Sequence, residues 1–237
     1  MTEIRNYDTS QEVADAAAEN AVEILRLAIE EKGSASWVLA GGTSPMLSYR
    51  KIVTDFADAI DWSLVTLIIG DERMVFLDDP DSNWGTIISL FESHPGMARA
   101  KQLVPHIHKS PELTAADYEE RIRDAGINRF DLVWLGVGED GHTLSLFPGN
   151  DGFTAATDQL VIPVYNSPKP PSNRISLSLK AAEMIVELVI FAVGSAKRDI
   201  LKRARLKGDV PVSVFAQTAE DHGAEVRWLY DDDAWGE

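Results

Sequence analysis

Apolar residues follow a helical spacing near the start of the chain. Thr9 and Ser10 are suited to cap a helix there, and Gly33 is suited to end it. The apolar face of this expected helix is made by Ala14, Ala17, Ala21, Ile24, Leu25 and Ala28. We therefore predict one long amphipathic helix that begins near residue 10 and ends at Gly33.

Further along the chain, apolar residues instead form short unbroken runs. Four runs predict buried strands at 37–40, 64–69, 132–137 and 188–193, and a later strand is expected at 225–230. Helical patterns lie between these strands at 45–56, 83–91, 115–125 and 196–206. This alternation predicts an α/β fold in which helices cover both faces of a mostly parallel sheet.

Each of these four apolar runs is followed directly by glycine and polar residues. Ligands of open parallel sheets bind outside the carboxyl ends of the strands, so we expect the functional site at these glycines. The proline-rich stretch 163–171 is expected to form a surface loop or a lid. No repeat or long linker divides the chain, which favours a single domain, 1–237.

Charge and composition narrow the possible partners. The net charge of −16 disfavours binding to nucleic acid or to anionic membranes, and it requires any anion site to be a local basic pocket. The absence of cysteine excludes disulfides and thiol catalysis. No apolar run approaches the roughly 18 residues that span a bilayer, so we expect a cytoplasmic protein.

The most informative motif ends the strand expected at 132–137. The segment contains a G-x-G-x-x-G pattern, but Pro148 and Gly149 interrupt the helix that a dinucleotide site needs. We interpret it as a glycine-rich bend that presents His142 to a cleft as a catalytic base, with Asp140 orienting the imidazole. The alternative is a loop histidine that satisfies only a local hydrogen bond.

Two other strand ends carry candidates for binding an anion. Gly41, Gly42 and Thr43 precede a helix that Pro45 can start, so backbone N–H groups and a hydroxyl are available for phosphate or sugar oxygens. The same residues would also make an ordinary helix start. Lys197, after the strand expected at 188–193, falls in the first turn of a helix, where a cation is unfavourable unless an anion is near.

The triplet at 71–73 follows the strand expected at 64–69. Arg73 is a candidate to stabilise an oxyanion or to hold a phosphate, whereas the alternative is a surface salt bridge within the triplet. Arg174 and Lys169, beside the proline-rich stretch, are second candidates for binding phosphate. Asp71 is the acid that a related deaminase or isomerase would need for proton abstraction.

Other known arrangements are missing from the sequence. There is no G-x-S-x-G nucleophile elbow and no G-x-x-x-x-G-K-[ST] phosphate loop. His106 and His108 lack a third ligand nearby in sequence, so we interpret them as structural and expect no metal site.

Taken together, the motifs resemble the 6-phosphogluconolactonase family, within the glucosamine-6-phosphate isomerase/deaminase-like superfamily. The matching segments are LAGGTSP at 39–45, GDERMV at 70–75 with Ser82 and Asn83, GVGEDGHTLSLFPG at 136–149, RISL at 174–177 and GSAK at 194–197. The run SLFPG after DGH resembles the lactonases, whereas the deaminases carry Asn-Glu-Pro there. Leu144 departs from the small residue usual in the family.

The resemblance implies a Rossmann-like α/β fold with a small additional sub-structure near the C-terminal half. It implies hydrolysis of 6-phospho-D-glucono-1,5-lactone, the second step in the oxidative branch of the pentose phosphate pathway, without a cofactor and by a monomer. His142 is then the general base with Asp140 and Arg73 as its catalytic partners. The substrate contacts are Gly41, Gly42, Thr43, Asp71, Arg174 and Lys197. The alternatives are a glucosamine-6-phosphate deaminase or isomerase, and a non-enzymatic sugar-phosphate sensor.

Overall fold

The computed structural model describes residues 2–154 and 157–236, which form a seven-stranded and a three-stranded sheet. The strand order of the large sheet is β1-β10-β9-β6-β2-β3-β5, and every neighbouring pair is parallel. These strands are β1 (Thr2–Tyr7), β2 (Ala35–Leu39), β3 (Val65–Ile69), β5 (Lys101–Leu103), β6 (Phe130–Gly136), β9 (Ile185–Ala192) and β10 (Glu225–Asp231).

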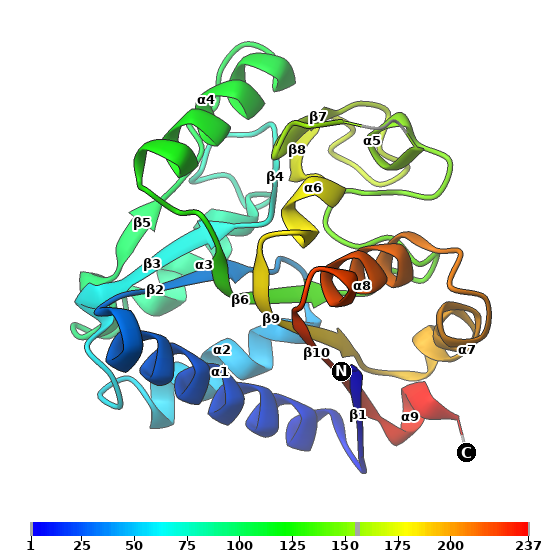
Figure 1. Ribbon diagram of the computed structural model, residues 1–237, viewed down its shortest axis with the longest axis horizontal. Helices are drawn as coiled ribbons and strands as arrows, with labels where there is room; N and C mark the ends of the chain where they lie inside the picture. The colour runs from blue at the N-terminus through cyan, green and yellow to red at the C-terminus, as the bar shows by residue number, and fades with distance from the viewer. Residues whose placement is uncertain (1, 155–156, 237) are drawn as a thin grey trace.

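Helices cover both faces of the large sheet, with α1 and α2 on one side and α8 on the other (Figure 1). The longer helices are α1 (Ser10–Lys32), α2 (Ser44–Asp55), α3 (Asn83–Phe91), α4 (Pro111–Asp124), α7 (Arg198–Lys207) and α8 (Pro211–Asp221). The short ones are α5 (Asp151–Thr154), α6 (Leu179–Ala182) and α9 (Asp232–Trp235), with 3-10 turns η1 (Trp62–Leu64), η2 (Met97–Arg99) and η3 (Ser195–Lys197). The architecture confirms the α/β fold and the mostly parallel sheet.

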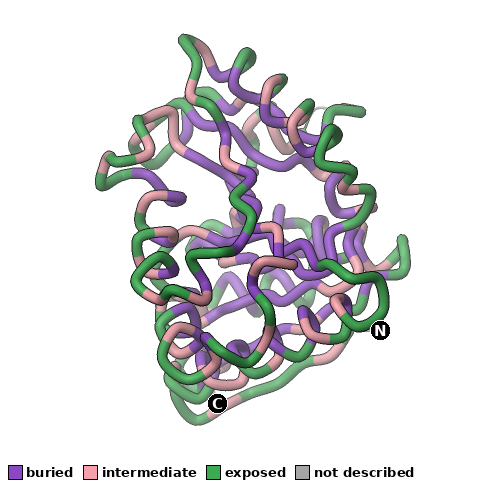
Figure 2. The backbone as a smooth tube through the Cα atoms, turned by 90° about the vertical axis from the view of Figure 1, so that its left-hand side faces the viewer, coloured by how far each residue is buried: buried purple, intermediate pink, exposed green. Residues whose placement is uncertain are grey.

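The first helix has the ends that the sequence predicts. Thr9 accepts the backbone N–H of Glu12 and Glu12 accepts that of Thr9, which is a capping box, and Gly33 ends the helix in the left-handed conformation. Strand β2 is buried along its whole length, and β3, β6 and β9 are buried at most positions, because helices pack on both faces. The buried segments run through the middle of the molecule in Figure 2. Their continuous apolar runs follow from that burial.

The small sheet is the additional sub-structure near the C-terminal half. It consists of β4 (Asp71–Arg73), β8 (Arg174–Leu177) and β7 (Val161–Val164), all antiparallel. Gly70 joins the two sheets, since its N–H donates to the carbonyl of Leu39 at 3.1 Å and its carbonyl accepts from Leu177 at 2.8 Å. A side chain at Gly70 would lie 2.6 Å from the Leu144 side chain, so glycine lets Leu144 pack against this junction.

Two expectations need correction. Strand β1 was not expected, because this edge strand lacks an apolar run and has no fully buried residue. The expected loop at 163–171 begins too early, since Pro163 belongs to β7. Proline is tolerated there because β7 is an edge strand of the small sheet.

Two tyrosine side chains form hydrogen bonds with the backbone at the carboxyl ends of β2 and β3. The Tyr49 hydroxyl accepts the N–H of Ala40 at 2.9 Å, and the Tyr118 hydroxyl accepts that of Ile69 at 2.9 Å. Both tyrosines are fully buried, and burial raises the pKa of each well above its usual value. The loops that follow β2 and β3 therefore start from backbone positions that these hydrogen bonds hold in place.

Candidate active site

A pocket of about 300 Å³ lies where the two sheets meet, beyond the carboxyl ends of β2 and β6. The residues singled out in the sequence that line it are Gly41, Gly42, Thr43, Asp71, Arg73, His142, Arg174 and Lys197. Lys169 also lines it, as do Asn83 and Leu144. The structure thus brings together segments that lie far apart in the chain, from Gly41 to Lys197.

His142 is held by Asp140 through one nitrogen of its ring and through its backbone. The Nδ1 atom of His142 lies 2.5 Å from Oδ1 of Asp140, and the same oxygen accepts the His142 backbone N–H at 3.1 Å. A proton on Nδ1 is thereby fixed, which leaves Nε2 unprotonated in the neutral ring. Asp140 itself does not line the pocket, so it acts from behind His142.

The position of the His142 ring and the conformation of its loop explain why glycines surround this residue. A side chain at Gly138 would lie 2.0 Å from the imidazole, and Gly141 has a φ of 84°, in the left-handed region. The chain after Gly141 turns back through a bridge between Thr143 and Leu146 and forms no helix. This conformation excludes the dinucleotide interpretation of the glycine pattern.

Burial sets the protonation state of His142. Its side chain is 15% exposed, and desolvation lowers its pKa below the usual value although Asp140 acts in the opposite direction. Burial alone would raise the pKa of Asp140, but the hydrogen bond and charge of His142 hold it below its usual value. The pair therefore offers a neutral imidazole next to a carboxylate at neutral pH.

Gly41, Gly42 and Thr43 form the wall of the pocket between β2 and α2. Among the described residues, no acceptor is found for their backbone N–H groups, and Thr43 makes no capping hydrogen bond with its side chain. Free donors at a helix N-terminus favour an anion or a sugar oxygen. Gly41 cannot carry a side chain, which would lie 2.2 Å from Oδ1 of Asn83.

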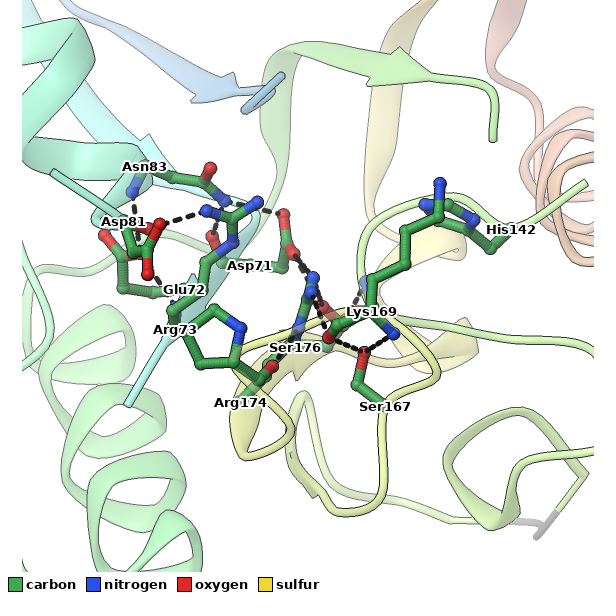
Figure 3. Close-up of polar contacts among 12 residues, drawn as sticks. Asp71, Glu72, Arg73, Asp81, Asn83, His142, Ser167, Lys169, Arg174 and Ser176 are labelled. Carbon is green, nitrogen blue, oxygen red and sulfur yellow. Dashed lines mark hydrogen bonds and ion pairs between the residues drawn. The ribbon is translucent and has the colours of Figure 1, made fainter. Parts of the chain in front are cut away.

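Arg73 extends from β4, and its guanidinium group is not fully used in hydrogen bonds to the protein. Its Nη1 donates to the carbonyl of Asp81 at 2.6 Å, while its buried Nε has no partner among the described residues. Figure 3 shows Arg73 above Asp71 and beside Asn83. The alternative interpretation, a salt bridge among residues 71–73, does not hold, because these residues form no such bridge with one another.

Glu72 is a fully buried carboxylate that the sequence did not single out. It accepts the backbone N–H groups of Asn83 at 2.8 Å and of Trp84 at 2.7 Å, so it anchors the start of α3. Desolvation raises the pKa of Glu72 above its usual value. Ser82 caps the same helix by accepting the N–H of Gly85.

Arg174 lines the pocket, yet each of its nitrogens has an acceptor in the protein. Nε donates to the carbonyl of Pro171 at 3.0 Å, Nη2 to that of Lys169 at 2.9 Å, and Nη1 to Oγ of Ser145 at 3.3 Å. Ser145 in turn donates to Asp71 at 2.6 Å. Arg174 therefore holds the backbone of the proline-rich loop in place against β4.

Two lysines bring positive charge to the pocket. Lys169 reaches from the proline-rich loop toward His142, as Figure 3 shows. Lys197 ends η3, and desolvation lowers its pKa below the usual value although Glu139 acts in the opposite direction. With Arg73 and Arg174, they make the local basic pocket that the overall charge of −16 requires for an anionic ligand.

His106 and His108 lie outside this pocket. Their rings face the same carboxylate, that of Asp117, at 3.4 and 3.6 Å. Residues 2–154 and 157–236 contain no group of three or more His, Cys, Asp or Glu side chains that could hold a metal ion. Nor does any helix in that part of the chain have both the length and the apolar character needed to cross a bilayer.

The fold and pocket define a class: a Rossmann-like α/β protein with a histidine–aspartate pair in a basic cleft at the carboxyl edge of its sheet. A family model described as "Glucosamine-6-phosphate isomerases/6-phosphogluconolactonase" matches residues 8–228. The chain belongs to this family.

Individual relatives agree with the family match. The 6-phosphogluconolactonase of Caulobacter vibrioides is 34% identical over 94% of this chain and 95% of its own length. The 6-phosphogluconolactonase of Homo sapiens is 30% identical over 83% of this chain and 78% of its own. The crystal structure of a 6-phosphogluconolactonase from Shewanella baltica superposes with a TM-score of 0.81 at 26% identity, covering 98% of each chain.

Proposed function

We propose that this protein hydrolyses 6-phospho-D-glucono-1,5-lactone to 6-phospho-D-gluconate, the second step in the oxidative branch of the pentose phosphate pathway. The family match and the lactonases among its relatives support this activity. The observation that carries the chemistry is the contact of 2.5 Å between Asp140 and Nδ1 of His142, which leaves Nε2 as a free base in a basic pocket.

The proposed reaction needs no covalent intermediate, because a lactone carbonyl is already electrophilic. Nε2 of His142 takes a proton from water while the water oxygen bonds to the carbonyl carbon. The carbonyl oxygen becomes negatively charged and faces donors such as Arg73. When the carbonyl re-forms, the bond to the ring oxygen breaks, and the imidazolium returns its proton to that oxygen. The products are the open carboxylic acid and the original neutral histidine.

The binding roles follow from which donors are free. Gly41, Gly42 and Thr43 offer unpaired N–H groups to substrate oxygens. Lys197 and Lys169 are assigned to the phosphoryl group, since both bring positive charge to the pocket. We assign Arg174 a positioning role, because its donors already have protein acceptors, and Asp71 holds Ser145 in the same network.

We also propose that the protein is a single domain over residues 1–237 and a cytoplasmic monomer that binds the phosphorylated lactone but neither nucleic acid nor membranes. The chain's charge of −16 supports the absence of nucleic-acid binding.

The test is an indicator assay of acid release on lactone generated in place, corrected for spontaneous hydrolysis. We expect rapid acid release that scales with the amount of protein. Ammonia release from glucosamine 6-phosphate without lactone turnover would instead assign the deaminase activity. Tight binding of 6-phosphogluconate with neither reaction would assign a sensor.

A further inference from the structure

The turn that follows β9 and carries Lys197 begins with an unusual backbone conformation at Gly194. Gly194 has φ 86° and ψ 151°, a region that is essentially restricted to glycine. The N–H of Lys197 then donates to the carbonyl of Gly194 at 3.0 Å, which closes the turn. Because of that hydrogen bond, the position of Gly194 determines where the Lys197 side chain starts.

The N–H of Gly194 is held by a buried carboxylate from the neighbouring strand. It donates to Oδ1 of Asp231 at 2.9 Å and to Oδ2 at 3.1 Å. Asp231 ends β10, which runs parallel to β9 with Tyr230 opposite Ala192, and it is only 3% exposed. A charged acceptor strengthens such a hydrogen bond, and burial removes the competition of water.

The residues after Asp231 support the same turn from outside the pocket. We call residues 231–236 the C-terminal hook. Arg198, next to Lys197, donates through Nη2 and Nε to the carbonyl of Asp233 at 3.0 and 3.2 Å. Arg205 on α7 stacks over the ring of Trp235, 3.9 Å from its centroid. Helices α7 and α9 accordingly lie side by side at one end of the molecule (Figure 1).

Asp231 also has a simpler role, since Oδ1 accepts the N–H of Ala234 at 2.9 Å and so caps α9. Capping explains one oxygen but not the two contacts to Gly194. A carboxylate that joins the turn to the hook fixes both segments with one buried charge.

We propose that Asp231 is a positioning residue for substrate binding: it fixes Gly194, and through Gly194 it directs Lys197 to the phosphoryl group. The inference rests on the proposed function, in particular on Lys197 as the phosphoryl ligand. It assigns the C-terminal end of the chain, which lies outside the pocket, a share in affinity for phosphorylated ligands.

The test is Asp231→Asn, which keeps the size of the side chain but removes its charge and turns one acceptor into a donor. We expect KM for the phosphorylated lactone and Kd for 6-phosphogluconate to rise about tenfold, with kcat within about twofold of wild type. The matched control is Asp233→Asn, two residues away, whose exposed side chain takes no part in the contact and whose constants we expect to be unchanged.

A second variant covers the case in which Asp231→Asn does not fold. Gly194→Ala adds a methyl group that meets nothing within 4 Å, so it perturbs only the backbone of the turn. We expect the same rise in KM and Kd. Wild-type constants in either variant, with only a lower melting temperature, would reduce Asp231 to a cap of α9 and overturn the proposal.

Lys197→Ala separates this inference from the proposed function. In that background Asp231→Asn should add no further rise in Kd, because both changes remove the same contact. An undiminished tenfold effect in the Lys197→Ala background would overturn the positioning role and leave the lactonase proposal intact. Absence of lactone turnover in the wild type would overturn the proposed function, and the Kd series for 6-phosphogluconate would still decide the role of Asp231.

Discussion

His142 and Asp140 show how the environment of one residue prepares it for a proton transfer. The contact of 2.5 Å fixes the tautomer, while burial keeps the pKa of His142 below its usual value of 6.5. The neutral form of the ring, which is the base, is therefore the main form above that lowered pKa. We predict that kcat/KM for the lactone rises with pH through this pKa and is level at neutral pH.

Asp140→Asn tests the part of the carboxylate. Asp140 acts to raise the pKa of His142, so its removal should lower that pKa further and move the acidic limb of the kcat/KM profile to lower pH. The plateau should fall by about 10- to 100-fold, because the weaker base is also less well oriented. A pH–rate series measures both effects. A limb that moved to higher pH would contradict the assignment.

The sequence predicted much of the pocket residue by residue. His142, Arg73 and Lys197 each follow a strand with glycine nearby, and parallel strands bring such ends to one edge. Glu72 and Ser145 escaped prediction because their roles depend on partners from other segments. The N–H groups that Glu72 accepts lie on α3, and Ser145 bridges Asp71 and Arg174.

Leu144 also shows a limit of residue patterns. Its backbone is left-handed, with φ 53°, and its side chain lines the pocket and packs against Gly70. The sequence marked Leu144 only as a departure from the small residue usual in the family, whereas the structure gives it a place in the pocket wall.

At the scale of elements, tyrosines on helices fix the strand ends from which the site loops start. Tyr49 on α2 satisfies both backbone groups of Ala40, directly before the glycine pair. We predict that Tyr49→Phe lowers the free energy of unfolding by about 1–3 kcal/mol, because the buried N–H of Ala40 loses its acceptor. Denaturant unfolding measures the change, and equal stability of the variant would contradict it.

The loop between β7 and β8 is the element that Arg174 holds. Lysine cannot reproduce a planar group that donates to several carbonyls at once. We predict that Arg174→Lys raises KM for the lactone about tenfold through the release of Lys169, with a smaller effect on kcat. Steady-state kinetics test this, and an unchanged KM would show that the loop does not need the guanidinium.

The elements that could be predicted from the sequence are those that are most buried in the structure. The central strands β2, β3, β6 and β9 have continuous apolar runs because both of their faces are covered. The exposed edge strand β1 and the short strands of the small sheet carry no comparable pattern. Their positions depend on pairing with distant segments, which local sequence does not encode.

For the whole molecule, the main feature is a basic pocket within a strongly acidic protein. A net charge of −16 destabilises the compact state through self-repulsion, which salt screens. We predict that raising the salt concentration from about 0.01 M to about 0.3 M increases the melting temperature by about 2–4 °C. The chlorides of sodium and of tetramethylammonium should act alike, and a fall in melting temperature would contradict the screening account.

The central claim is that His142 activates the water that opens the lactone. The most direct measurement is kcat of His142→Ala on freshly generated 6-phosphogluconolactone, corrected for spontaneous hydrolysis, with 6-phosphogluconate binding as the control for an intact pocket. We predict a loss in kcat of about 10²–10⁴-fold with little change in affinity. Turnover close to wild type in a variant that still binds 6-phosphogluconate would contradict the account.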